Sequence, residues 1–309
     1  MKKENYAQSL DVTPIVRATL ANEHWYRNGA PNWLEGRGKP WERPCETAAG
    51  ACARREKAVQ KLGRAAFIVP GAVKLAKRLE NCEPHQRCVS GACPECNRAL
   101  QRSFVVHSQT TLATIKRSEP PLLVSIVPDF GRLPLIDATK ARWKSIKLRL
   151  RKALREVGIT LAMLGVDFSV NTRQTDKFIQ GQLWGVICNP PASWKADLKP
   201  LINDTGQISR PLRVRVFDGY PAGLAYSIMT RFAAKSWYVD FNHSRDDRGS
   251  SSNTRNRFLQ GGPDWLQLML FLDVIGLDSR IVLIGIKRII SKDEVIFQRS
   301  KVKGKRESA

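Results

Sequence analysis

The sequence predicts an α+β fold in which helices cover one face of an antiparallel sheet, preceded by a helical N-terminal region. Two observations lead to this prediction. Up to about Pro120 the apolar residues recur at helical spacing, whereas short apolar runs typical of strands begin after it. From there the order is strand, helix, strand, strand, helix or strand, and helix. The 309 residues, 42% of them hydrophobic, are enough for one large or two modest domains with a real core.

The N-terminal region contains the first predicted helices. Residues 1–50 are rich in Trp, Pro and Gly, which indicates irregular structure with a short helix at Asp11–Glu23. A helical pattern follows over Ala53–Leu79, and Pro70 and Gly71 divide it into two helices. A further helix is predicted to begin after Cys96.

Four cysteines lie within fifteen residues, at Cys82, Cys88, Cys93 and Cys96. Their spacing, C-x5-C-x4-C-x2-C, suits a tetrahedral Zn²⁺ site, because the short C-x-x-C lets two thiolates reach one ion from a single turn. With four protein ligands the ion would be structural, since no coordination position stays open. His85 is an alternative ligand, and so are Cys45 and Cys52. Four unrelated buried cysteines or a redox pair are the other interpretations.

The sheet elements follow the cysteines. Each strand is predicted from a short apolar or alternating run, and each helix from apolar residues at helical spacing. Thr172–Lys177 forms a turn between two strands, and Pro200 stops a short helix. The elements are a strand at Leu122–Val127, a helix at Asp137–Glu156, strands at Ala162–Asn171 and Phe178–Cys188, a helix at Ala192–Lys199 and a strand at Leu212–Phe217.

The last part of the chain mixes helical, polar and apolar segments. Ala222–Ser236 reads as a helix that contains Tyr226, and His243–Arg257 is polar enough to predict a mobile loop. A helix at Asp264–Val274 follows Pro263, and a strand is predicted at Ile281–Ile286. These boundaries divide the chain into a helical region with the cysteine cluster (1–118), an α+β domain (119–292) and a basic tail (293–309).

The net charge of +23, from 51 Lys and Arg against 28 Asp and Glu, predicts binding to a polyanion, first of all nucleic acid. The alternative is a ribosome-associated or merely basic protein. Within the helix at Asp137–Glu156, basic residues cover the face opposite the apolar positions, which indicates either a phosphate-binding surface or simple solvation. These residues are Lys144, Lys147, Arg149, Arg151, Lys152 and Arg155.

The sequence favours a cytoplasmic protein without a membrane partner. Its first residues lack the apolar core of a secretion signal. The most apolar stretch, Trp265–Ile290, is interrupted by charged residues and reads as buried helix and strand. The seven cysteines then favour metal binding and free thiols over disulfides.

Three segments, GVDFSVNTRQTDKFIQGQLWGVICNP, AGLAYSIMTRFAAK and GLDSRIVLIGIKR, resemble HUH-type replication initiators of rolling-circle plasmids and phages. The resemblance covers roughly residues 82–290 and rests on the order of the segments and on their pattern of apolar and polar residues. It implies a Rep-like sheet in which a His-hydrophobic-His strand and a neighbouring carboxylate bind a divalent metal. A tyrosine on a later helix then attacks a DNA phosphodiester.

Carried over by position, the resemblance puts Gln182 and Trp184 where the two histidines would be, and Asp167 at the neighbouring carboxylate. It puts the nucleophile at Tyr226, with Arg231 or Lys235 nearby. Trp cannot ligate a metal and Gln is a poor ligand, so the catalytic Mg²⁺ or Mn²⁺ site is predicted to be degenerate. His243 is the best replacement ligand, ahead of His24 and His107. Taken singly, Asp167, Trp184 and Tyr226 also suit structural roles.

Three functions follow. The first is a DNA-binding protein on a replication-initiator scaffold, holding single-stranded or hairpin DNA through basic residues, including Arg213 and Arg215, and through Trp143, Trp184 and Trp237. The second is an active tyrosine-dependent DNA nickase-ligase. The third is an RNA- or ribonucleoprotein-binding module in which zinc only organises the fold. A covalent DNA adduct would separate the first two.

Overall fold

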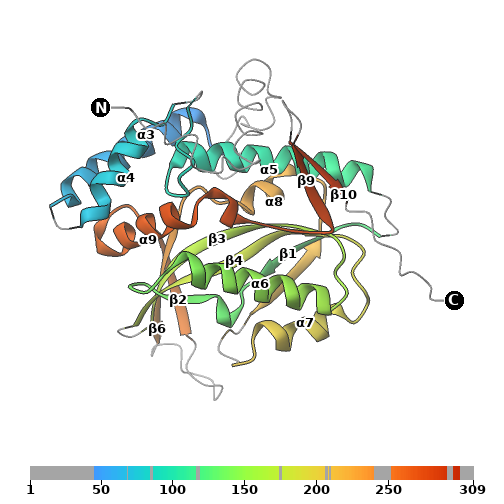
Figure 1. The fold of residues 1–309 in the computed structure, drawn as a ribbon. Coiled ribbons are helices and arrows are strands. Elements are labelled where there is room, and N and C mark those ends of the chain that lie inside the picture. The colour runs from blue at the N-terminus through green and yellow to red at the C-terminus, as the bar shows by residue number, and fades with distance from the viewer. Residues whose placement is uncertain are drawn as a thin grey trace.

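The structure is a computed structural model that describes residues 45–299 except 68, 84–85, 116–118, 174–175, 206–207, 209, 240–251 and 291–294 (Figure 1). The helix predicted at Asp11–Glu23, His24, His243 and most of the predicted basic tail (293–309) lie outside this description. Within that tail, Val295–Arg299 forms a strand, β10, which was not predicted. No helix among the described residues is long and apolar enough to cross a membrane.

The N-terminal region forms helices α3 (Ala48–Ala65), α4 (Pro70–Glu80) and α5 (Pro94–Thr114). The Thr47 side chain caps α3 by accepting a hydrogen bond from the Gly50 amide at 3.1 Å. The predicted division at Pro70 is confirmed, because α4 begins there with proline in its first turn. Helix α5 also begins at a proline, Pro94, so Cys96 lies in the first turn of the helix and not before it.

Within the described residues, eight strands form one mixed sheet, which confirms the α+β class. The order of the main path is β5-β1-β4-β3-β6-β7, while β2 pairs with β4 and β8 pairs with β3. All of these pairs are antiparallel except β3 with β6, which run parallel, so the prediction of a purely antiparallel sheet was wrong. The strands are β1 (Leu122–Ile126), β2 (Arg132–Pro134), β3 (Ala162–Arg173), β4 (Asp176–Ile187), β5 (Leu212–Val216), β6 (Ala233–Val239), β7 (Ser252–Phe258) and β8 (Ile281–Ile284).

Helices lie on both faces of the sheet, and the prediction of a single covered face was wrong (Figure 1). On one face, Phe168 of β3 packs edge-on against Trp143 of α6 (Lys140–Glu156) and Phe271 of α9 (Gly262–Ile275), with ring centroids 4.8 and 5.5 Å apart. Helix α7 (Trp194–Ile202) lies beside α6. The opposite face is covered by α5 and by α8 (Pro221–Tyr226). A separate hairpin of β9 (Ile286–Ile290) and β10 (Val295–Arg299) lies near α5.

Three predicted segments differ from the structure. The helix predicted over Ala222–Ser236 ends at Tyr226 as α8, because the chain from Ala233 onward pairs with both β3 and β7 as β6. The loop predicted at His243–Arg257 contains strand β7 from Ser252 onward. Helix α7 continues through Pro200 to Ile202, where the missing N–H affects only its last turn.

Candidate metal centre and sheet-face site

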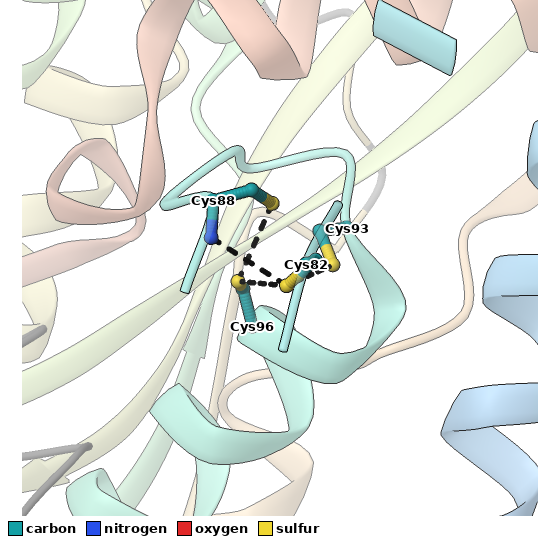
Figure 2. Close-up of side chains that lie close together, drawn as sticks. All are labelled: Cys82, Cys88, Cys93 and Cys96. Atoms are coloured by element: carbon teal, nitrogen blue, oxygen red, sulfur yellow. Dashed lines mark hydrogen bonds between the residues drawn. The ribbon is translucent and has the colours of Figure 1, made fainter. Parts of the chain in front are cut away.

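The four cysteines of the predicted cluster converge on one point (Figure 2). Their sulfur atoms all lie within 4.8 Å of one another, and Cys82 Sγ lies 3.6 Å from both Cys93 Sγ and Cys96 Sγ. Four sulfurs about 2.3 Å from a central Zn²⁺ would be separated by roughly 3.8 Å, so these spacings suit a tetrahedral ion. The cluster could therefore hold a metal such as zinc, as the sequence predicted.

Burial, arginine side chains and packing against α9 fix the segment that carries the cysteines. Cys82, Cys93 and Cys96 are buried and Cys88 is half-buried. Arg55 donates to the Cys82 carbonyl oxygen at 2.5 Å and pairs with Glu95 at 3.0 Å, and Arg87 pairs with the same carboxylate at 2.8 Å. Gly91 allows the loop to lie directly on α9, because a Cβ there would be 2.4 Å from the Leu272 carbonyl oxygen.

Two of the three alternative ligands lie outside this group. Cys45 is buried elsewhere in the core, and the Cys52 thiol donates to Glu56 at 3.5 Å. His85 is not among the described residues, so its role stays a prediction. The Cys88 thiol, followed by those of Cys93 and Cys96, lowers the pKa of Cys82 well below its usual range, which favours a thiolate within the cluster.

On the α8 face of the sheet, the four residues expected from the initiator resemblance lie together. Asp167 of β3 stands opposite Gln182 of β4, and Trp184 lies two residues further along on the same face. Tyr226, the last residue of α8, packs edge-on against Trp184, with ring centroids 4.7 Å apart. A Cβ at Gly165, opposite Trp184, would be 2.1 Å from the Ser227 carbonyl oxygen, so glycine allows the end of α8 to rest on β3.

Both oxygens of the Asp167 carboxylate are engaged by protein groups. Gln182 Nε2 donates to Oδ2 at 3.1 Å, and the Phe168 amide donates to Oδ1 at 2.9 Å. Lys235 Nζ in turn donates to Gln182 Oε1 at 3.4 Å. Because Asp167 is only 5% exposed and already bonded, its carboxylate is poorly available as a metal ligand.

Arg280 supplies the buried counter-charge for Asp167. Its guanidinium lies 3.9 Å from Asp167 Oδ1 and is fully buried. It donates to the carbonyl oxygens of Val166 at 3.2 Å and Met229 at 2.7 Å. Val166 lies in the part of β3 between its pairings with β8 and β6, so Arg280 supplies a hydrogen bond where neither strand does. A third bond goes to the Oδ1 of Asn97, the residue that follows Cys96. The cysteine cluster and Asp167 are thus joined by the side chains of Asn97 and Arg280.

The ionisable groups of this face are shifted mainly by burial. Burial raises the pKa of Asp167, against the opposing effect of Arg280, and burial lowers the pKa of Lys235. Burial also raises the pKa of Tyr226, and the negative charge of Asp167 adds to the shift. The Tyr226 hydroxyl is therefore harder to ionise than a free tyrosine, and a nucleophilic role would need an added positive charge.

The predicted nucleic-acid-binding residues fall on opposite sides of the sheet. Arg213 shares the face of Trp184, since both stand opposite Ser125, and Arg215 lies two residues further along the edge strand. Arg231 lies over the Phe258 ring at 5.8 Å. The basic residues of α6 lie across the sheet from Tyr226, and two of them have acidic partners, in the pairs Arg149–Asp204 at 2.9 Å and Lys152–Glu156 at 3.6 Å.

The prediction that Trp143 stacks on bases was wrong. Trp143 is 1% exposed, contacts Phe168, and donates its indole N–H to the Ser279 carbonyl oxygen at 3.2 Å. The side chain of Trp237 lies outside the part of the chain that the structure describes. Trp184 is only half-buried, and its indole N–H has no hydrogen-bond partner among the described residues.

Sequence reasoning missed Arg280 and Asn97. Arg280 interrupts the apolar stretch from Trp265 to Ile290, and a charge inside such a run is the signal that could have marked it as buried and paired. Comparison with protein-family models, curated proteins and solved structures finds no match to this chain. Any assignment of function rests on the geometry of the sites.

Proposed function

We propose that the protein binds nucleic acid, single-stranded or hairpin DNA in the first place, through the sheet face that carries Trp184 and Tyr226. The proposal includes a replication-initiator-like scaffold whose metal-dependent catalytic site has been lost. Its role would be in plasmid, phage or mobile-element replication, or in a process derived from it. The observation that supports it best is the Trp184–Tyr226 pair beside two cations, Arg213 and Lys235, next to a carboxylate already bonded within the protein.

Exposed aromatic and basic side chains beside α8 suit a single strand. Tyr226 is 47% exposed, so its ring can stack on an unpaired base, and such contacts contribute about 1–3 kcal/mol each. Arg213 and Arg215 are exposed on the edge strand and can contact successive phosphates. The net charge of +23 adds a long-range attraction that salt would weaken.

The loss of metal chemistry is supported by what surrounds Asp167. Gln182, at the first histidine position of the initiator pattern, uses its amide to hold the carboxylate, and Lys235 donates to the same amide. Trp184, at the second position, offers no lone pair to a metal. In the cysteine cluster we propose a structural Zn²⁺, whose binding would stabilise the N-terminal region by several kcal/mol or more.

Fluorescence anisotropy with a labelled single-stranded 20-mer tests the binding face. We expect Arg213→Ala combined with Lys235→Ala to weaken binding at least tenfold and to reduce the slope of log K against log salt by about 1.4, or about 0.7 for each phosphate contact to a single strand. The matched control is Lys144→Ala combined with Arg155→Ala, which removes two exposed cations from the opposite face. If the control pair lost more affinity than the sheet-face pair, the proposed surface would be wrong. A labelled single-stranded RNA of the same sequence tests the RNA-binding alternative.

An active tyrosine nickase-ligase is the second candidate, and the exposure of Tyr226 beside Lys235 and Arg213 favours it. In this mechanism the tyrosine oxygen attacks the phosphorus, and the 3′ oxygen of the preceding nucleotide leaves. The test is incubation with labelled single-stranded DNA and Mg²⁺ or Mn²⁺, followed by denaturing electrophoresis. We expect no covalent adduct from the wild type. An adduct that Tyr226→Phe abolishes would establish the nickase.

A further inference from the structure

A cavity of about 270 Å³ lies outside the sheet-face site. It is bounded by α3, by the segment that leads into β6, by the end of β7 and by the start of α9. Neither Asp167 nor Tyr226 lines it. Its volume is just below the roughly 300–1,000 Å³ typical of small-molecule sites, which suits one compact ligand or ligand group.

The charge of this cavity is positive and mostly uncompensated. Lys57, Lys61 and Arg231 line it, and no acidic side chain does. None of the three forms an ion pair with a described carboxylate, although Lys61 donates to the Gln260 carbonyl oxygen. Arg54, the fourth basic residue of the lining, is neutralised by Glu46. An anionic group of a ligand would therefore be attracted to Lys57 and Arg231, whose side chains are exposed.

Aromatic rings form the complementary part of the wall. Phe232, Phe258 and Trp265 line the cavity, and the Arg231 guanidinium lies 5.8 Å from the Phe258 ring centroid. Phe258 is 49% exposed, so part of its ring is available for contact with a ligand. A planar ring of a ligand could stack there, as bases do on aromatic platforms.

We propose that this cavity binds a single nucleotide, with its base against Phe258 and its phosphate between Lys57 and Arg231. Ala92 and Pro94, from the cysteine segment, line the same cavity, so the metal centre supports part of its wall. The nucleotide could be free or part of a bound chain. Ala233, which stands opposite Phe258, lies two residues before Lys235 on β6, about 7 Å along a strand. A chain bound at the sheet-face site could therefore also place one nucleotide in this cavity.

Isothermal titration calorimetry with dAMP tests the proposal on the whole protein. We expect the wild type to bind dAMP, and we expect Lys57→Glu and Phe258→Ala each to weaken that binding about tenfold. Both side chains are exposed, so their replacement should leave the fold intact. The matched control is Lys74→Glu, an exposed lysine of α4 away from the cavity, which should bind dAMP as the wild type does. Inorganic phosphate and deoxyadenosine, tested separately, should bind more weakly than dAMP.

Failure of dAMP to bind at millimolar concentration would overturn the proposal, and so would equal binding of phosphate alone. An effect of Arg213→Ala equal to that of Lys57→Glu on dAMP would also overturn it, because the nucleotide would then occupy the sheet face. The proposed function is tested separately by the 20-mer. A 5′-phosphorylated (dA)10 that binds more tightly than the 5′-hydroxyl form, with the difference lost in Lys57→Glu, would identify a chain terminus as the source. Binding of dAMP without that preference would identify a free nucleotide.

Discussion

Asn97 joins the cysteine cluster to the buried charge of the sheet, and Asn97→Ala should destabilise both. Asn97 is fully buried. Its Nδ2 donates to the carbonyl oxygens of Gly91 at 2.7 Å and Cys93 at 2.9 Å, and its Oδ1 accepts from Arg280. Alanine removes all three bonds without supplying other partners.

The expected loss follows from these contacts. A buried polar group left without a partner costs about 1–3 kcal/mol, and the bond to Arg280 is charge-assisted. Arg280 keeps its bonds to Val166 and Met229, and the costs are not fully additive, so we expect Asn97→Ala to lower the free energy of unfolding by about 3–5 kcal/mol. The bound metal should also be released faster, because the Gly91 carbonyl of the cysteine loop loses its side-chain donor and the Cys93 carbonyl keeps only the backbone amide of residue 97.

Urea unfolding followed by tryptophan fluorescence, in a zinc-buffered solution, measures the first effect. Transfer of zinc to a coloured chelator measures the second. The matched control is Asn203→Ala, which removes two hydrogen bonds to Ile208, at 3.0 and 3.1 Å, from a half-buried loop that water can enter. We expect that control to cost about 1 kcal/mol. A loss for Asn97→Ala no larger than that of the control would refute the proposed coupling.

Three further predictions concern other parts of the fold. Cys93→Ser should abolish the zinc found by elemental analysis and destabilise the N-terminal helices. Removal of zinc from the wild type with a chelator should destabilise the same helices. An unchanged zinc content in Cys93→Ser would exclude Cys93 as a ligand. Gly165→Ala should cost about 2–4 kcal/mol in thermal unfolding, because its Cβ displaces the Ser227 carbonyl; an unchanged midpoint would contradict this contact. Burial lowers the pKa of His107 to about 4, so between pH 7 and 5 the imidazole gains a proton in the unfolded state but not in the folded state. The free energy of unfolding should therefore fall by about 2 kcal/mol over this range. In His107→Gln this part of the pH dependence should be absent from urea unfolding curves, and an unchanged pH dependence would contradict it.

The elements that the sequence predicted well have strong local signals. The helix at α6 and the β3–β4 hairpin show clear periodicity, and their boundaries agree within a few residues. The failures lie where partners distant in sequence decide. Ala233–Val239 has a helix-compatible pattern, but β3 and β7 provide backbone partners that make it a strand. Nothing in the local pattern indicates that β6 runs parallel to β3.

The candidate sites show the same division. The cysteine spacing alone placed the four thiols together, because they lie within one short segment. The order of Asp167, Gln182, Trp184 and Tyr226 suggested a shared site, and the sheet register brings them to one face. Arg280 could not be assigned to that site from spacing, since its partner Asn97 is 183 residues away.

The charges around Asp167 make a divalent ion at that position unfavourable, which supports the proposal of a lost catalytic metal. Arg280 and Lys235 already compensate the one carboxylate from two sides. Two unit charges 4 Å apart interact by about 4 kcal/mol at an effective dielectric constant near 20, so an added cation would be repelled by each of these groups. The cysteine cluster has the opposite balance, because its thiols become a stable set of thiolates only when a cation binds them. On these grounds the cysteine cluster is the site that could hold a metal, whereas the positive charge that acts on Tyr226 is that of Arg213, with Lys235 close to Asp167.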